Sequence, residues 1–192
     1  MNAHNAERRI LGVVLCGGRS SRMGRNKSLL AHPDGGRFID HAIEQLQAVC
    51  EEVCIAGAAD AKPGDLDPIF LTDDVAHQGP VTGIVNALEH ASKHNFDACF
   101  VTPVDMPWLT HVQLATLTDA WSTKQVLTCG IDDANKLQPL VAIYPEETIE
   151  QLRELSQSSD RSLYRWIATQ PHQTVRLPGN SNRNINRPDD LH

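Results

Sequence analysis

The sequence predicts a three-layer α/β sandwich with a Rossmann-like, mostly parallel sheet and an added antiparallel hairpin. Short apolar runs alternate with amphipathic segments, which is typical of parallel strands covered by helices on both faces. A basic, glycine-rich stretch follows the first apolar run, at the place where an open α/β sheet binds its ligands. Two later apolar and β-branched runs flank a polar turn, and this pattern predicts the hairpin.

The elements of the parallel core follow from hydrophobic periodicity. Four runs are almost continuously apolar or β-branched and are predicted to be strands: 10–16, 53–56, 69–72 and 98–102. Two segments with a one-sided apolar stripe are predicted to be helices: 38–49 and 81–91. A proline at position 80 suits the first turn of the second helix. Residues 110–113 have the form of a capping box, which predicts a third helix carrying Leu114, Leu117 and Trp121.

The alternation of predicted strands and helices ends after residue 125. Runs 126–131 and 140–144 flank the polar turn 132–136, so they are predicted to pair as a hairpin. Two further helices are predicted at 148–155 and 162–168. The chain is then expected to leave the fold as a tail through residues 178–180.

Composition limits the classes of function. The 192 residues suit one domain at 10–192, preceded by a polar, flexible extension at 1–9. The formal charge of −7 argues against broad nucleic-acid binding. The first apolar run is too short for a signal-peptide core or a membrane span, so we expect a cytoplasmic protein with no membrane partner.

The cysteines and histidines do not form a metal-binding pattern. The five cysteines include no C-x-x-C pair, and four of them lie in apolar runs, so they are predicted to be reduced core residues rather than zinc ligands. The nine histidines are scattered along the chain. Most of them are therefore expected at the surface or at helix caps.

The stretch after the first predicted strand combines glycines with basic residues. Gly17 and Gly18 allow a sharp turn whose N–H groups can approach phosphate oxygens. Four basic residues fall within nine positions of an acidic chain: Arg19, Arg22, Arg25 and Lys27. The stretch therefore predicts a triphosphate site, with a solvated basic loop as the alternative.

Two common nucleotide motifs are excluded. Gly17, Gly18 and Gly24 do not have the spacing of G-x-G-x-x-G. A Walker loop requires Lys directly after its last glycine, whereas Gly24 is followed by Arg25-Asn26-Lys27. A P-loop ATPase or GTPase is therefore not expected.

The stretch resembles the signature L-x-G-G-x-S-x-R-M-G-x-D-K of the sugar-phosphate and cofactor nucleotidylyltransferases, here at residues 15–27. Residues 79–83 resemble their G-P-L-x-G segment, and 103–109 resemble P-x-D-M-P-x-L. Residues 138–144 and 184–191 resemble the Q-P-L-x-A-x-Y and N-x-N-x-P-x-D-L elements of one branch, the molybdenum cofactor guanylyltransferases. The five segments occur in the family's order and span essentially the whole chain.

The resemblance implies an activity and a fold. It implies a fold of the nucleotide-diphospho-sugar transferase type and transfer of GMP from GTP to molybdenum-molybdopterin, with release of pyrophosphate. It also implies Mg²⁺ as cofactor, and proteins that deliver the cofactor or chaperone molybdoenzymes as partners. Three residues depart from the family pattern: Cys16 replaces Ala, Asn26 replaces Asp, and Ala58 replaces an Asn that contacts the nucleotide in some relatives. Ala58 weakens the preference for guanine over cytosine.

The resemblance also assigns the catalytic residues. Asp105, after a predicted strand, corresponds to the Mg²⁺ ligand, and a capping carboxylate in a turn is its alternative reading. Lys27 and Arg22 are expected at the β- and γ-phosphates, with the N–H groups of Gly17 and Gly18 around the phosphate chain. A phosphate monoester is already ionised near neutral pH, so no covalent enzyme intermediate and no obligatory general base are expected.

Nucleotide and acceptor contacts are assigned in the same way. Leu15 and Cys16 are expected to frame the base and ribose through backbone groups. Asp73 is the candidate carboxylate that reads the nucleotide, with Asp74 as competitor and an exposed acidic turn as the alternative for both. The acceptor side is represented by three amide residues, which could equally be caps: Gln138, Asn184 and Asn186.

Two other functions remain open. The first is a cytidylyltransferase acting on molybdopterin or on another phosphorylated acceptor, although that branch tends to have His-Pro where this chain has Gln138-Pro139. The second is a GTP-binding, cofactor-handling module without turnover. The presence of Lys27 and Asp105 argues against the second function.

Overall fold

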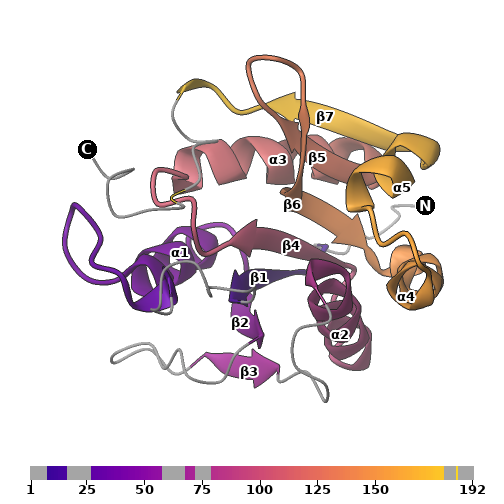
Figure 1. Ribbon diagram of the computed structural model, residues 1–192, viewed down its shortest axis with the longest axis horizontal. Coiled ribbons are helices and arrows are strands. Elements are labelled where there is room, and N and C mark those ends of the chain that lie inside the picture. The colour runs from indigo at the N-terminus through magenta and orange to yellow at the C-terminus, as the bar shows by residue number, and fades with distance from the viewer. Residues whose placement is uncertain (1–7, 17–26, 58–67, 72–78, 180–184, 186–192) are drawn as a thin grey trace, which may run out of the picture.

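The computed structural model describes residues 8–16, 27–57, 68–71, 79–179 and 185. The α/β sandwich predicted from the sequence is confirmed in this part of the chain. A seven-stranded sheet has the order β3-β2-β1-β4-β6-β5-β7, and helices lie on both of its sides (Figure 1). No helix among these residues is long and apolar enough to cross a membrane.

The first half of the sheet is parallel. The strand β1 (Ile10–Cys16) pairs with β2 (Glu52–Gly57) on one side and with β4 (Ala98–Pro103) on the other, and β2 pairs with β3 (Ile69–Leu71). Every residue of β1 and of β4 is buried. Burial on both faces explains why these strands are continuous apolar runs in the sequence.

The second half of the sheet contains the predicted hairpin. The strand β6 (Leu137–Pro145) is antiparallel to β5 (Leu127–Ile131), as expected, and it also pairs antiparallel with β4. The turn between β5 and β6 is closed by Asp132, whose Oδ1 accepts from the N–H groups of Ala134 and Lys136 at 2.9 and 2.8 Å. An Asx-type turn of this kind is the usual reason for Asp at the start of a hairpin loop.

A seventh strand was not predicted. The strand β7 (His172–Arg176) pairs in parallel with β5 at the edge of the sheet, where the sequence indicated only the approach to a tail. Its residues alternate between exposed and half-buried, so it lacks the apolar run that marks the central strands. Downstream of β7, the N–H of Leu177 donates to the carbonyl of Ile131 at 2.9 Å and the Leu177 side chain is fully buried.

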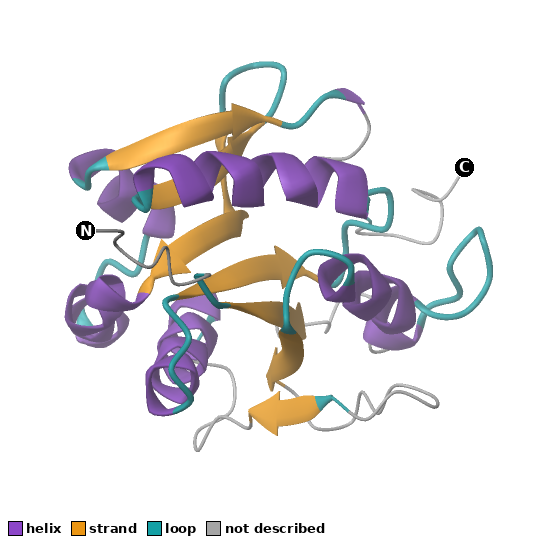
Figure 2. Ribbon diagram, turned by 180° about the vertical axis from the view of Figure 1, so that it is seen from behind, coloured by secondary structure: helices purple, strands orange, loops and turns teal. Residues whose placement is uncertain are grey.

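The helices divide between the two faces of the sheet (Figure 2). One face is covered by α1 (Phe38–Gln47) and α3 (His111–Lys124). The other face is covered by α2 (Pro80–Lys93), α4 (Ile149–Gln157) and α5 (Leu163–Thr169). The predicted capping box of α3 is present, because the N–H of Thr110 donates to Oε1 of Gln113 at 2.8 Å.

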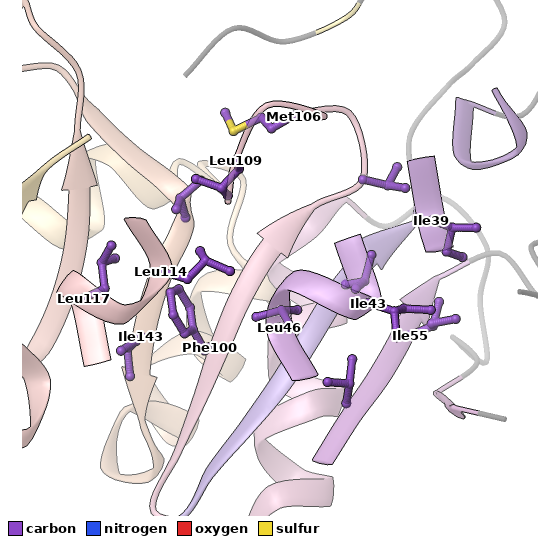
Figure 3. Packing of buried hydrophobic residues seen from close by; sticks show 14 of the residues in the cluster. Ile39, Ile43, Leu46, Ile55, Phe100, Met106, Leu109, Leu114, Leu117 and Ile143 are labelled. Carbon is purple, nitrogen blue, oxygen red and sulfur yellow. The ribbon is translucent and has the colours of Figure 1, made fainter. Parts of the chain in front are cut away.

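Each face of the sheet carries its own hydrophobic core. Alternate residues of β1 enter the two cores, with Val14 in the first and Val13 in the second. The first core joins Ile43 and Leu46 of α1 to Leu114 of α3 (Figure 3). Met106 and Leu109, from the loop after β4, belong to the same core and are only 6% and 4% exposed (Figure 3). The loop that contains Asp105 is therefore seated on packed side chains.

The five cysteines are free thiols, as predicted. Four of them are buried, and Cys50, after α1, is half-buried. Burial raises the pKa of the Cys16 thiol to about 12, so this residue beside the predicted phosphate loop is protonated near neutral pH. It packs as a small apolar side chain in the first core.

Candidate active site

Three predicted site residues that the structure describes, Leu15, Cys16 and Asp105, lie at one edge of the sheet. Because β1, β2 and β4 are parallel, their carboxyl ends lie at the same edge, where Cys16 is in register with Gly57 and Leu15 with Pro103. Asp105 follows β4 by two residues. The end of β1, where residues 15 and 16 are predicted to frame the nucleotide, therefore adjoins the loop with the predicted metal ligand.

The loop from Val104 to Leu109 is anchored by main-chain hydrogen bonds. The N–H of Val104 donates to the carbonyl of Leu15 at 3.3 Å, which ties the loop to the end of β1. The N–H of Ile185 donates to the carbonyl of Asp105 at 2.9 Å, and the Ile185 side chain is fully buried. The N–H of Leu109 donates to the carbonyl of Met106 at 3.2 Å. The half-buried Asp105 is thus held through its backbone from two distant parts of the chain.

The glycine segment before α2 lies against β1. Gly79 has a φ of 89°, a conformation that residues with a Cβ rarely adopt, and Pro80 follows as the first residue of the helix. A Cβ on Gly83 would lie 3.1 Å from Cδ2 of Leu15, so a glycine here lets α2 approach the end of β1 closely. The N-terminus of α2 consequently lies near the carboxyl edge.

The start of β6 reaches the same edge because β6 runs antiparallel to β4. Ala142 is in register with Val101, so the residues that precede Ala142 extend towards the carboxyl end of β4. Among them, Gln138 donates from Nε2 to Oδ2 of Asp132 at 3.3 Å. This bond turns the amide nitrogen towards the hairpin turn and fixes the orientation of a residue predicted for the acceptor side.

The structure thus brings the end of β1, at Leu15 and Cys16, together with the family-like segments 79–83, 103–109 and 138–144 and with Ile185. Several predicted site residues nevertheless lie outside the described residues. These are Gly17, Gly18, Arg22, Asn26, Ala58, Asp73, Asp74, Asn184 and Asn186. Lys27 opens the short helix η2 (Lys27–Leu29), and only its backbone is described.

Sequence reasoning missed a buried histidine at this edge. Most histidines, His32 among them, are predicted to lie at the surface or at helix caps, but His32 is only 5% exposed. Its Nε2 lies 2.9 Å from the carbonyl oxygen of Pro107, in the Asp105 loop. The sequence offered one signal, a histidine next to the turn-forming residues 33–36, and that signal does not reveal the partner.

A metal at this edge would be held by few protein ligands. The described residues contain no group of three or more His, Cys, Asp or Glu side chains that could hold a metal ion. Mg²⁺ in phosphoryl-transfer sites is bound through one or two carboxylates together with waters and substrate phosphates. The single hard carboxylate of Asp105, on an anchored loop at the ligand-binding edge, fits that chemistry.

A sheet of this topology, with a basic glycine loop after β1 and a carboxylate loop after β4, defines a nucleotidyltransferase. The family model for the MobA-like NTP transferase domain matches residues 12–175. The chain belongs to this family.

A relative from Rhodopirellula baltica (strain DSM 10527 / NCIMB 13988 / SH1) is named "Probable molybdenum cofactor guanylyltransferase". It is 43% identical over 195 residues, covering 98% of this chain and 92% of the relative. The similarity therefore extends over nearly the whole chain.

Solved structures share the fold. Molybdopterin-guanine dinucleotide biosynthesis protein A from Archaeoglobus fulgidus aligns with a TM-score of 0.70 at 23% identity, over 94% of each chain. A Mycobacterium tuberculosis H37Rv protein solved in complex with manganese aligns with a TM-score of 0.70 at 15% identity, over 95% of each chain.

Proposed function

We propose that this protein transfers GMP from GTP to molybdenum-loaded molybdopterin, which forms molybdopterin guanine dinucleotide and releases pyrophosphate. The observation that carries the proposal is the meeting of family-like segments at one sheet edge, where the Asp105 loop is bonded to Leu15 and to Ile185. The 43% identical relative with the guanylyltransferase name supports the choice of reaction.

Charge neutralisation and alignment supply the chemistry of this reaction. Both reactants are anions, so the phosphate of molybdopterin must be brought against the α-phosphorus of GTP, in line with the leaving pyrophosphate. In our proposal Lys27 and Arg22 bind the β- and γ-phosphates and stabilise the pyrophosphate as it leaves. The attacking phosphate is already ionised, so no side chain needs to remove a proton.

Asp105 is the proposed ligand of Mg²⁺. A bound Mg²⁺ would neutralise phosphate charge and hold phosphate oxygens in place. Asp105 supplies a hard oxygen ligand from a loop that rests on the buried side chains of Met106 and Leu109. The packing and the main-chain hydrogen bonds of the loop restrict the movement of Asp105 during the proposed reaction.

Nucleotide and acceptor are proposed to bind on the two sides of this loop. The carboxyl end of β1, at Leu15 and Cys16, forms proposed contacts to the nucleotide, and Asp73 forms another. Gln138 is the proposed contact to the acceptor, and its bond to Asp132 presets the orientation of its amide. An oriented amide loses less conformational entropy when it binds a ligand than a free one does.

The cellular partners follow from the same chemistry. We propose that the enzyme works in the cytoplasm, receives molybdenum-loaded molybdopterin from a delivering protein and passes its product to chaperones of molybdoenzymes. Direct transfer would protect a labile cofactor from water.

Pyrophosphate release by the purified protein tests the proposed function. The protein is supplied with Mg²⁺, molybdenum-loaded molybdopterin and either GTP or CTP, and Asp105→Asn is run beside it. Release with GTP that depends on Asp105 is the expected result. A preference for CTP would reassign the chain to cytidylyl transfer, and GTP binding without release would indicate a cofactor-handling module. Intact-mass measurement during turnover should detect no nucleotidylated protein.

A further inference from the structure

The segment between η2 and α1 folds back on itself. The N–H of Phe38 donates to the carbonyl of Leu30, and the N–H of His32 donates to the carbonyl of Gly36, each at 3.0 Å. Gly35 and Gly36 adopt φ values of 99° and 71°, which permit the tight reversal. His32 is therefore carried by a closed loop that begins three residues after η2.

Two backbone groups bond the two nitrogens of the His32 ring. A carbonyl oxygen can only accept, so Nε2 carries the hydrogen and donates to the Pro107 oxygen at 2.9 Å. The N–H of Asp34 lies 3.1 Å from Nδ1. Both ring nitrogens of His32 are thus in hydrogen bonds to backbone groups.

Aromatic neighbours hold the ring in place. The His32 ring stacks on the His41 ring of α1, with centroids 4.1 Å apart and an angle of 15° between the planes. The Phe38 ring meets it edge-on, with centroids 5.9 Å apart. These contacts leave the His32 ring little freedom to turn away from Pro107.

Pro107 is two residues beyond Asp105, on the same loop. The bonds from Leu15 and Ile185 hold the first part of that loop, at Val104 and Asp105. His32 holds its second part, and it does so from the segment that starts at Lys27. The bond joins residues that are 75 positions apart in the sequence.

We propose that His32 is a positioning residue for nucleotidyl transfer. By bonding Pro107, it fixes the Asp105 loop against the segment that begins at Lys27, so that the metal-binding carboxylate keeps a constant position relative to the backbone of that segment. The inference rests on the proposed function for its effect on the reaction, but the bond itself can be tested without turnover.

Three variants separate positioning from general stability. His32→Phe keeps an aromatic ring in the stack and removes both hydrogen bonds, whereas His32→Gln keeps an N–H donor near the position of Nε2. His94→Phe is the matched control, because His94 also stacks on a histidine, His90, at 4.0 Å and bonds a backbone carbonyl at 2.8 Å. His94 follows the last residue of α2, away from the helix end that lies near the site.

The expected result is a selective loss in His32→Phe. Its kcat should fall about tenfold and its Mg²⁺ concentration for half-maximal rate should rise, because a small displacement of reacting groups is costly. Its KM for GTP should change less than about twofold, because binding of the ground state depends less on this spacing. His32→Gln should recover most of the rate, and His94→Phe should match the wild type.

Amide hydrogen exchange provides the readout that does not need activity. Residues 104–109 should exchange faster in His32→Phe than in the wild type and return towards wild-type protection in His32→Gln. Wild-type exchange in His32→Phe, or equal loss in His32→Phe and His32→Gln, would overturn the proposal. If the wild type releases no pyrophosphate, the proposed function fails, and the exchange comparison still decides whether His32 anchors the loop.

Discussion

The two ends of the β1–β4 strand pair are fastened by different chemistry. At the amino end, the N–H of Arg9 donates to Oδ2 of Asp97 at 2.9 Å, and the N–H of Asp97 donates to the carbonyl of Arg9 at 2.8 Å. Arg8 pairs with the same carboxylate at 2.6 Å. Arg9 also binds Glu51 through two nitrogens and lies 4.1 Å over the ring of Phe96. Charged side chains therefore hold this end together.

At the carboxyl end, hydrogen bonds to backbone groups hold the Asp105 loop. Their partners include the N–H groups of Val104 and Ile185, the carbonyl of Leu15 and the imidazole of His32. The loop at the proposed ligand-binding edge is therefore held through backbone hydrogen bonds, whereas the opposite end of the strand pair is held by charged side chains.

The largest effect is expected for Asp105→Asn, which should lower activity and leave the fold intact. Asp105→Asn should lower kcat by about a hundredfold or more, because the amide is a poor ligand for Mg²⁺. Its free energy of unfolding should change by less than about 1 kcal/mol, since the loop is anchored through main-chain atoms. Pyrophosphate release and urea denaturation measure the two quantities.

The control for this prediction is Asp119→Asn, the same substitution at an exposed position on α3. It should leave both quantities at their wild-type values. Unfolding of Asp105→Asn would show that the carboxylate supports the loop itself, and the contrast between the two ends would then be wrong.

Prediction from sequence succeeded where burial is strong. The central strands were found because β1 and β4 are buried on both faces and read as apolar runs. The strand β7 was missed because an edge strand with alternating exposure resembles a polar loop. Asp105 and the other site segments were identified through family motifs. The contact of His32 could not be predicted from the sequence. Its partner, Pro107, lies 75 residues away and contributes a backbone oxygen, which every residue type has.

A substitution at the amino end should have the opposite effect. Arg9→Met removes the bonds to Glu51 and the contact with Phe96, and it also removes a 2.8 Å bond to the carbonyl of His94. The melting temperature should fall by a few degrees, whereas kcat should stay at the wild-type value. Differential scanning calorimetry and the pyrophosphate assay provide the measurements.

The matched variant is Arg165→Met, which removes another Arg–carboxylate pair, that with Asp160. The side chains of this pair are 70% and 55% exposed, so its loss should hardly change the melting temperature. An equal fall in the two variants would show that Arg9 contributes no more than an ordinary surface ion pair. A fall in kcat in Arg9→Met would show that the two ends of the strands are coupled.

The smallest effect concerns acid stability, where the two ends should differ again. Burial, and then charge on the neighbouring His32, lower the pKa of His41 below its ordinary value, against weaker opposing effects of a backbone hydrogen bond with Leu109 and of Glu44 and Asp34. The unfolded chain has a histidine pKa of about 6.5 and so binds a proton there more readily than the folded protein. The stabilising contribution of neutral His41 is therefore complete above about pH 6.5 and is lost as the pH falls towards the lower, folded pKa. By contrast, the Arg9–Glu51 pair of the amino end keeps its charges through this range, because the hydrogen bond from Arg9 lowers the pKa of Glu51.

Replacing His41 with Phe should consequently reduce the loss of melting temperature between pH 7 and pH 5, while an aromatic ring remains stacked on His32. Part of the loss should persist, because burial also lowers the pKa of His90. His172→Phe, at an exposed position of β7, serves as the control and should keep the wild-type slope. The same slope in wild type and His41→Phe would mean that acid weakens the protein elsewhere than beneath the Asp105 loop. A reduced slope in His41→Phe together with a wild-type slope in Arg9→Met would locate the acid-sensitive contacts at the carboxyl end.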